Sequence, residues 1–131
     1  MVLAAKIIND ERVASFVSEE LGVQFIPPYT LMGLERDGVI VAGVVFHVFE
    51  GANIHVTVAG HGWTRSFLKE AGRYVFDVLG CERFTITTEH PYVARLGERL
   101  GGAIEGYARN QFGRGRNAFL VGVLKDEYRF K

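Results

Sequence analysis

The chain has 131 residues, of which 48% are hydrophobic and 23% charged, which suits one compact core and argues against disorder. Fifteen Lys and Arg balance fifteen Asp and Glu, so no excess of charge indicates a nucleic acid or an anionic membrane as partner. The single cysteine, Cys81, excludes an internal disulfide and a cysteine-clustered zinc site, and it suits a reducing compartment. No apolar run is long enough to span a bilayer, and no charged leader indicates secretion. We therefore expect one soluble, cytoplasmic domain over residues 1–131.

The first half of the chain predicts one helix and a meander of antiparallel strands. Apolar residues recur at helical spacing from Val13 to Leu21, after the capping pair Asn9-Asp10. Asp37-Gly38 is a strong two-residue hairpin signal, and a turn at residues 50–53 joins the next two strands. The expected elements are strands at residues 2–8, 29–36, 39–49 and 54–58 and a helix at residues 13–21.

The second half alternates helices with strands. A long apolar stripe predicts a helix that begins after Gly62 and ends at Gly80, and Pro91 suits the first turn of a shorter helix. The Gly-rich, basic segment QFGRGRN predicts the long tip of a final hairpin. The remaining expected elements are strands at residues 83–88, 103–109 and 118–125 and a helix at residues 91–100. This order predicts an α/β fold with a central mixed, mostly antiparallel sheet and helices on both faces.

A glycine-rich turn between a strand and a helix is the first candidate for a binding site. In the run IHVTVAGHGWTRSFL, several backbone N–H groups would lie at the positive end of a helix dipole, where they can hold a pyrophosphate. Gly60 and Gly62 permit a close approach of the backbone, and Arg65 can pair with a phosphate oxygen. A simple tight turn is the alternative explanation of the same pattern.

Short motifs along the chain carry a resemblance to a known family. They are Gly62 in its glycine loop, YVF at residues 74–76, LGCER at residues 79–83, RLGERLG at residues 95–101, and Glu105-Gly106 followed by Arg109. With these motifs, the stretch from Tyr29 to Tyr128 resembles the GCN5-related N-acetyltransferase (GNAT) family, especially the branch of the ribosomal-protein N-terminal acetyltransferases. The segment GHGWTR is similar to phage-encoded members.

The resemblance implies a single acyl-CoA N-acyltransferase domain with acetyl-CoA as co-substrate. An acceptor amine of unknown identity, on a protein N-terminus or a small molecule, would attack the thioester carbonyl beside the fourth strand while both substrates are bound. The residues implied to contact the co-substrate are Val58, Gly60, His61, Gly62, Trp63, Thr64, Arg65 and His90. Trp63 would cover the adenine or pantetheine, or else anchor the start of the helix in the core.

Three side chains are candidates for the catalytic groups of such a reaction. His55 lies on the strand expected to face the reaction centre and titrates near neutral pH, which suits a general base. Glu50 is a rival base that would act through water. A two-residue turn at Gly51-Ala52 would place Val48 opposite His55 and turn His47 to the other face. Tyr92 is a candidate acid for the departing thiolate, as is Tyr107.

The sequence also departs from the family pattern. Ala59 stands where the family loop begins with Gln or Arg, and His90 replaces the usual Asn after strand five. Gly97 stands at the position of the Tyr that often serves as the acid for the departing thiolate. These departures leave a second hypothesis, in which the chain is a catalytically degenerate GNAT-fold module with a structural or partner-binding role.

The histidines and the hairpin tip carry weaker signals. Four histidines on three elements form no HxxxH or HxH pair, so no metal site is expected. Arg114 and Arg116 at the hairpin tip either form a solvated loop or select an acidic acceptor. The resemblance implies that this hairpin borders the acceptor site or a homodimer contact, and neither nucleic acid nor membrane is expected as a partner.

Overall fold

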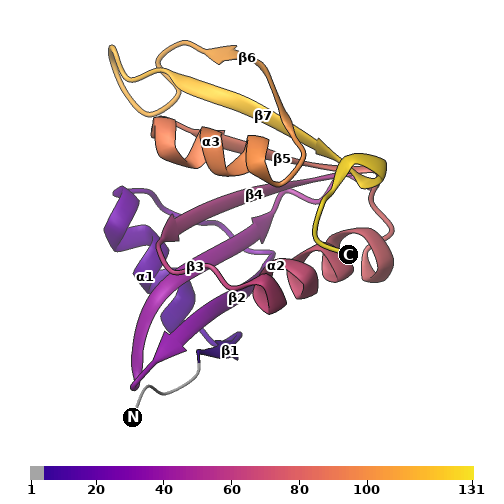
Figure 1. Ribbon diagram of the computed structural model, residues 1–131. Helices are drawn as coiled ribbons and strands as arrows, with labels where there is room; N and C mark the ends of the chain where they lie inside the picture. The colour runs from indigo at the N-terminus through magenta and orange to yellow at the C-terminus, as the bar shows by residue number, and fades with distance from the viewer. Residues whose placement is uncertain (1–4) are drawn as a thin grey trace.

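Seven strands form a single sheet in the computed structural model, which describes residues 5–131 (Figure 1). The strands are β1 (Lys6–Ile8), β2 (Tyr29–Arg36), β3 (Val39–His47), β4 (Asn53–Gly60), β5 (Arg83–Thr88), β6 (Ala103–Ala108) and β7 (Ala118–Leu124). Their order in the sheet is β1-β2-β3-β4-β5-β7-β6, and every neighbouring pair is antiparallel except β4 and β5. The predicted mixed, mostly antiparallel sheet is confirmed; of its first strand, residues 2–4 lie outside the described part of the chain.

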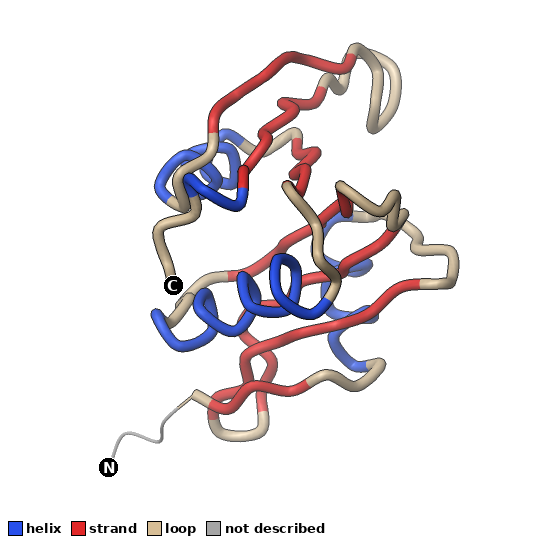
Figure 2. The backbone as a smooth tube through the Cα atoms, turned by 90° about the vertical axis from the view of Figure 1, so that its right-hand side faces the viewer, coloured by secondary structure: helices blue, strands red, loops and turns tan. Residues whose placement is uncertain are grey.

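Helices cover both faces of this sheet, as the sequence predicts (Figure 2). They are α1 (Arg12–Leu21), α2 (Arg65–Gly72), the π-helix η1 (Arg73–Val78), α3 (Pro91–Arg99) and the 3₁₀ turn η2 (Lys125–Glu127). On one face, α1 buries Val13 and Val17 against Val45 and Ala59. On the other face, α2, η1 and α3 enclose the larger core together with the inward side chains of β3, β4, β5 and β7.

The ends of the helices follow from local chemistry. At the start of α1, Asp10 Oδ1 accepts a hydrogen bond from the backbone N–H of Arg12 at 3.0 Å, so Asp10 caps the helix as expected. At its end, Gly22 takes a positive φ of 65° and donates its N–H to the carbonyl of Ser18. Pro91 occupies the first turn of α3, where its missing N–H costs no helical hydrogen bond.

The long central helix changes from α-helical to π-helical geometry half-way along its length. One regular helix was expected up to Gly80, but the backbone is α-helical only to Gly72 and π-helical from Arg73 to Val78. Tyr128 packs against the point of change, because a Cβ atom on Gly72 would lie 2.3 Å from Tyr128 Cε2. The hydroxyl of Tyr128 donates a hydrogen bond to the carbonyl of Leu68 in α2, so the C-terminal segment is tied to this helix.

Candidate functional site

The sheet opens between its two parallel strands. The pairing of β4 with β5 runs from Asn53 opposite Arg83 to Val56 opposite Ile86. Beyond this pair, β4 continues to Gly60 and β5 to Thr88 without pairing to each other. Two parallel strands that separate in this way leave backbone groups and side chains free to face a ligand.

A glycine loop follows the free end of β4. Gly60 has a φ of 99°, and a Cβ atom there would lie 2.2 Å from the carbonyl oxygen of Val41, so no other residue fits this approach to β3. The N–H of His61 donates to the same carbonyl at 3.0 Å. Gly62 has a φ of 84°, and its carbonyl accepts a hydrogen bond from Arg36 Nη2 at 3.3 Å. These contacts hold the loop in one conformation.

The loop presents a row of backbone N–H groups. Thr64 caps α2, because its Oγ1 accepts a hydrogen bond from the N–H of Phe67 at 3.1 Å. The N–H groups of residues 62–66 find no acceptor among the described residues. These donors lie at the positive end of α2, where a helix attracts an anion.

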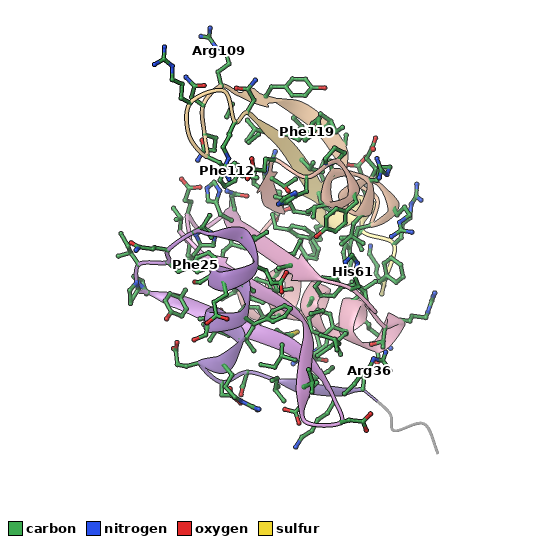
Figure 3. The ribbon with its side chains drawn as sticks, turned by 90° about the vertical axis from the view of Figure 1, so that its left-hand side faces the viewer. Phe25, Arg36, His61, Arg109, Phe112 and Phe119 are labelled. Atoms are coloured by element: carbon green, nitrogen blue, oxygen red, sulfur yellow. The ribbon has the colours of Figure 1, made fainter. Side chains whose placement is uncertain are left out.

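The opening beside this row of donors suits a negatively charged ligand. It has a volume of about 510 Å³, and its lining includes Arg65, Arg99 and His61 but no Asp or Glu. Arg65 also lies over the ring of Phe130, with 5.6 Å between the guanidinium carbon and the ring centroid. Figure 3 shows His61 and Arg36 on the same side of the molecule.

Two further rings extend the loop side of the site. The rings of His61 and Tyr92 stack with their centroids 5.5 Å apart, and His90 lies 5.8 Å from Tyr92. Tyr92 and His90 come from the start of α3, so this row crosses from the end of β4 to the end of β5. Tyr92, a candidate catalytic acid, lines the opening together with five of the predicted co-substrate residues: Gly60, His61, Gly62, Trp63 and Arg65. The other three, Val58, Thr64 and His90, are not part of its lining.

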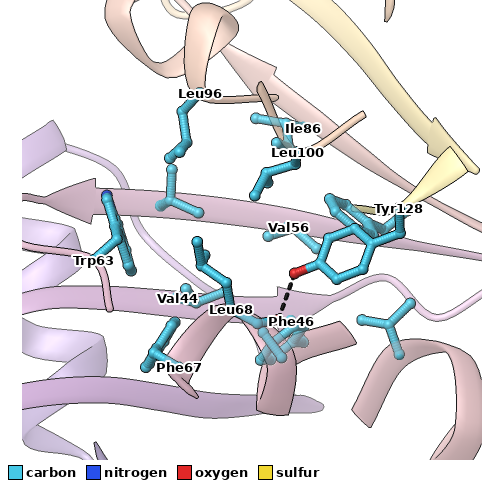
Figure 4. Close-up of a pocket in the computed structure, with 14 residues that line it drawn as sticks. Val44, Phe46, Val56, Trp63, Phe67, Leu68, Ile86, Leu96, Leu100 and Tyr128 are labelled. Atoms are coloured by element: carbon cyan, nitrogen blue, oxygen red, sulfur yellow. Dashed lines mark hydrogen bonds between the residues drawn. The ribbon is translucent and has the colours of Figure 1, made fainter. Parts of the chain in front are cut away.

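A small apolar cavity lies beneath the opening (Figure 4). Its volume is about 40 Å³, and Val58 and Trp63 are part of its wholly apolar surface. Trp63, Leu68, Leu96 and Leu100 line both this cavity and the opening above it. Trp63 packs on Phe67 of the core, with ring centroids 5.3 Å apart, and it also borders the opening.

A second hollow, which we call the histidine hollow, lies on the α1 face of the sheet. It has a volume of about 600 Å³ and is lined by residues of β3, β4, β5, the segment before β2 and the β6–β7 hairpin. His55 and His47 both line it. Val56, the last residue of β4 that pairs with β5, lines this hollow on one face of the sheet and the apolar cavity on the other.

The position of His47 corrects the expected register. His47 lies directly opposite His55, with 6.3 Å between their ring centroids, and not on the other face of the sheet. The expected two-residue turn at Gly51-Ala52 is wrong, because residues 48–52 join the strands and Val48 takes a positive φ of 50°. The longer connection shifts the pairing by one residue, which turns His47 onto the face of His55.

Glu50 and His55 interact directly. Glu50 Oε1 lies 2.9 Å from His55 Nε2 and accepts a second hydrogen bond from Asn53 Nδ2 at 2.9 Å. The hydrogen bond from Asn53 and that from His55 hold the pKa of the Glu50 carboxyl below its usual value. Glu50 is therefore a carboxylate at neutral pH, placed to orient His55.

His47 has a different environment. Its Nε2 lies 2.8 Å from Thr57 Oγ1 on the neighbouring strand. Burial lowers the pKa of the His47 imidazole, and the nearby His55 lowers it further. His47 is therefore neutral at pH 7, and it adds a polar but uncharged group to the wall of the hollow.

Several residues of these spaces were not anticipated from the sequence. Arg36 and Arg99 approach the glycine loop from distant segments, and no local pattern connects them with it. Thr57 and Thr87 could have been found, because they alternate with buried residues on β4 and β5. Phe112, at the hairpin tip, lines the histidine hollow.

Two other kinds of feature are absent from residues 5–131. Within this range, no group of three or more His, Cys, Asp or Glu side chains is arranged to hold a metal ion. No helix there is both long and apolar enough to cross a bilayer.

The fold is similar to that of known acetyltransferases. A mutant form of the spermidine/spermine N-acetyltransferase SpeG from Vibrio cholerae matches with a TM-score of 0.74 and 13% identity over 95% of this chain and 97% of that chain. Spermidine N-acetyltransferase from Vibrio cholerae in complex with CoA and spermine matches with a TM-score of 0.70 and 13% identity over 95% and 97% of the two chains. A dodecameric structure of spermidine N-acetyltransferase from the same organism, in an intermediate state, matches with a TM-score of 0.69 and 12% identity over 93% and 94%. No family model and no curated protein matches the sequence.

These neighbours are members of the GNAT superfamily, so the chain has the GNAT fold that its motifs resemble. Because the identities are 12% to 13%, the likeness extends to the fold and not to the substrate.

Proposed function

We propose that this protein is an acetyl-CoA-dependent N-acetyltransferase that acts on a primary amine. The observation that carries the proposal is the row of free N–H groups at residues 62–66, beside an opening lined by Arg65 and Arg99. The opening borders the apolar cavity at Trp63, and Val56 lies between that cavity and the histidine hollow on the other face of the sheet. A neighbour of the same fold was solved with CoA and spermine, which supports this class of reaction.

Each part of the opening suits a part of acetyl-CoA. The N–H groups of residues 62–66 would hold the pyrophosphate, and Arg65 and Arg99 would pair with phosphate oxygens. Val58 and Trp63 would contact the pantetheine arm, since they line the apolar path towards the gap between β4 and β5. His61, Tyr92 and His90 would flank the co-substrate, which assigns Tyr92 to binding.

The reaction itself needs a base on the far side of the gap. The amine nitrogen attacks the acetyl carbonyl carbon, so that a C–N bond forms as the C–S bond breaks. His55 accepts the proton that the amine loses, and the departing thiolate takes a proton from water. Because both substrates are held together, proximity supplies much of the rate.

The proposal also covers the acceptor, the cellular compartment and the oligomeric state. The acceptor amine belongs to a protein N-terminus or to a small molecule, as the likeness to the ribosomal-protein acetyltransferase branch implies. We place the activity in the cytoplasm, where acetyl-CoA and a reduced Cys81 are both expected. We also propose a homodimer, which light scattering tests against the chain mass of 14.6 kDa.

Trp63 offers a direct test, because it is the single tryptophan of the chain and borders the proposed path. The cavity beneath it, at about 40 Å³, is too small for a pantetheine arm, so binding must move the Trp63 side chain. We expect acetyl-CoA to change the fluorescence of Trp63 with a saturable, micromolar midpoint.

Two matched variants complete the test. Gly62→Asp adds a carboxylate beside the N–H groups and should abolish the fluorescence change by repelling the pyrophosphate. Gly80→Asp also replaces a glycine of positive φ, 71° against 84°, but at the far end of the helix, and should bind like the wild type. If acetyl-CoA leaves the fluorescence of the wild type unchanged and calorimetry detects no binding, the enzyme proposal fails and a non-catalytic module is the better description.

A further inference from the structure

The histidine hollow carries no net charge in its walls. Its lining contains no Asp, Glu, Lys or Arg side chain, and about half of its lining residues are apolar. Burial lowers the pKa of His47, one of its two histidines, so this imidazole is neutral at pH 7. Glu50, at the rim, is already engaged by Asn53 and His55. The hollow therefore offers few groups of opposite charge that could pair with a second charged group on a ligand.

Two phenyl rings, Phe25 and Phe112, are part of the lining of the hollow. Phe25 packs edge to face on His47 at 5.4 Å, and Tyr29 packs on Phe25 at 6.4 Å. Phe112 approaches from the hairpin tip, and Figure 3 shows Phe25 and Phe112 on the same side of the molecule. Both phenyl rings are half-buried, so each keeps a free edge or face that an apolar group can cover.

Polar side chains line the floor of the hollow, and Gln24, His47 and Gln111 add uncharged polar groups to its walls. His55, Thr57 and Thr87 lie on the floor, in β4 and β5, where the strands begin to separate. An acceptor can therefore place its amine beside His55 while the rest of the molecule rests against Phe25 and Phe112. At about 600 Å³, the hollow is of the size that takes a small organic molecule or the first residues of a peptide.

From this arrangement we propose that the acceptor is a primary monoamine bearing an aromatic group, and not a polyamine. The inference rests on the proposed function and names the substrate class of that same site. A polyamine would bring a second ammonium group into a space without a carboxylate, where its loss of hydration is uncompensated. An aromatic amine buries its ring and leaves no unpaired charge.

An acetylation assay with four acceptors at equal concentration tests this proposal. Phenethylamine and tryptamine represent free aromatic amines, phenylalanyl-glycine amide represents an aromatic N-terminal residue, and spermidine represents the polyamines. We expect kcat/KM to be at least about tenfold higher for one of the aromatic acceptors than for spermidine. The ratio between the free amines and the dipeptide amide identifies the source of the amine.

A variant of the hairpin tip tests the position of the ring. Phe112→Ala should raise KM for the aromatic acceptor about tenfold and leave KM for acetyl-CoA unchanged. Ile104→Ala, in the same hairpin but 36% exposed and outside the hollow, is the matched control and should keep both values.

The outcomes separate this inference from the proposed function. If acetyl-CoA changes the fluorescence of Trp63 but spermidine is acetylated as well as the aromatic amines, the aromatic acceptor is wrong and the enzyme proposal stands. The same holds if Phe112→Ala leaves KM for the aromatic amine unchanged. If the co-substrate binds and none of the four acceptors reacts, the aromatic acceptor is wrong and only the co-substrate site stands. If acetyl-CoA does not bind, both proposals fall.

Discussion

The carboxylate of Glu50 determines which nitrogen of His55 can accept a proton. Since the lowered pKa keeps Glu50 ionised, its Oε1 can only accept a hydrogen bond, so His55 Nε2 carries the hydrogen that it shares over 2.9 Å. The neutral imidazole then has its lone pair on Nδ1. In the proposed reaction, His55 is the base and Glu50 is the residue that fixes its tautomer.

His55→Gln tests this division of roles. We expect kcat to fall about 100-fold or more, because glutamine cannot accept the proton, while KM for acetyl-CoA stays within about twofold. Glu50→Gln keeps the size of the side chain, but its amide can donate as well as accept a hydrogen bond, so it no longer forces the hydrogen of His55 onto Nε2. This variant should therefore lower kcat less than His55→Gln does. Steady-state kinetics with a reactive amine give both values, and an equal loss in the two variants would instead favour Glu50 as the base.

Single residues also show where prediction from the sequence ends. The strand that carries His55 was predicted at residues 54–58, and the structure has it at Asn53–Gly60. His47 was misplaced because its face depends on the length of the connection at residues 48–52, where a valine takes the unusual φ of 50°. Phe25 and Phe112 lie in irregular segments, and nothing local relates two loop residues so far apart in the chain.

At the scale of elements, α3 packs very closely on β7. A Cβ atom on Gly97 would lie 2.7 Å from Val121 Cγ1 and 3.4 Å from Ile86 Cδ1. Gly97 stands where the family pattern has the tyrosine that serves as acid, and here that position faces the sheet. The departure from the pattern is therefore a matter of packing, because no tyrosine fits unless α3 moves away from β7.

A double-mutant cycle measures this contact. Gly97→Ala removes a helix penalty of about 1 kcal/mol, but it overpacks the interface at a cost of about 1–3 kcal/mol, so we expect a lower free energy of unfolding. Val121→Ala removes the methyl group that the new Cβ of Gly97→Ala would contact, and on its own it destabilises the protein by leaving a cavity. The double variant should lose less stability in urea denaturation than the sum of the two, and additive losses would contradict the packing explanation.

At the scale of the whole molecule, the C-terminal segment joins the two parts of the sheet. Residues after β7 return across the core, where Tyr128 packs on Phe76 of η1 and Phe84 of β5. Burial raises the pKa of the Tyr128 phenol, whose hydroxyl donates to the carbonyl of Leu68. Phe130 continues from there to the co-substrate opening. One short segment thus stabilises both the core and the rim of the site.

Tyr128→Phe should lower the free energy of unfolding by about 0.5–1.5 kcal/mol, since the part-buried hydrogen bond to the carbonyl of Leu68 is lost. Tyr107→Phe removes the hydroxyl of an exposed tyrosine and should change it by less than about 0.5 kcal/mol. Urea denaturation of the two variants beside the wild type measures the difference. Equal stability of all three proteins would mean that the hydroxyl of Tyr128 contributes nothing to the fold.

The hairpin of β6 and β7 stands apart from the glycine loop. Its tip, residues 109–117, supplies Gln111 and Phe112 to the histidine hollow but no residue to the co-substrate opening. Mutation can therefore lengthen, shorten or replace the tip without disturbing the residues that would hold the phosphates. Over evolutionary time, related proteins can therefore acquire new acceptors by changes in this one short loop, while the residues of the glycine loop stay the same.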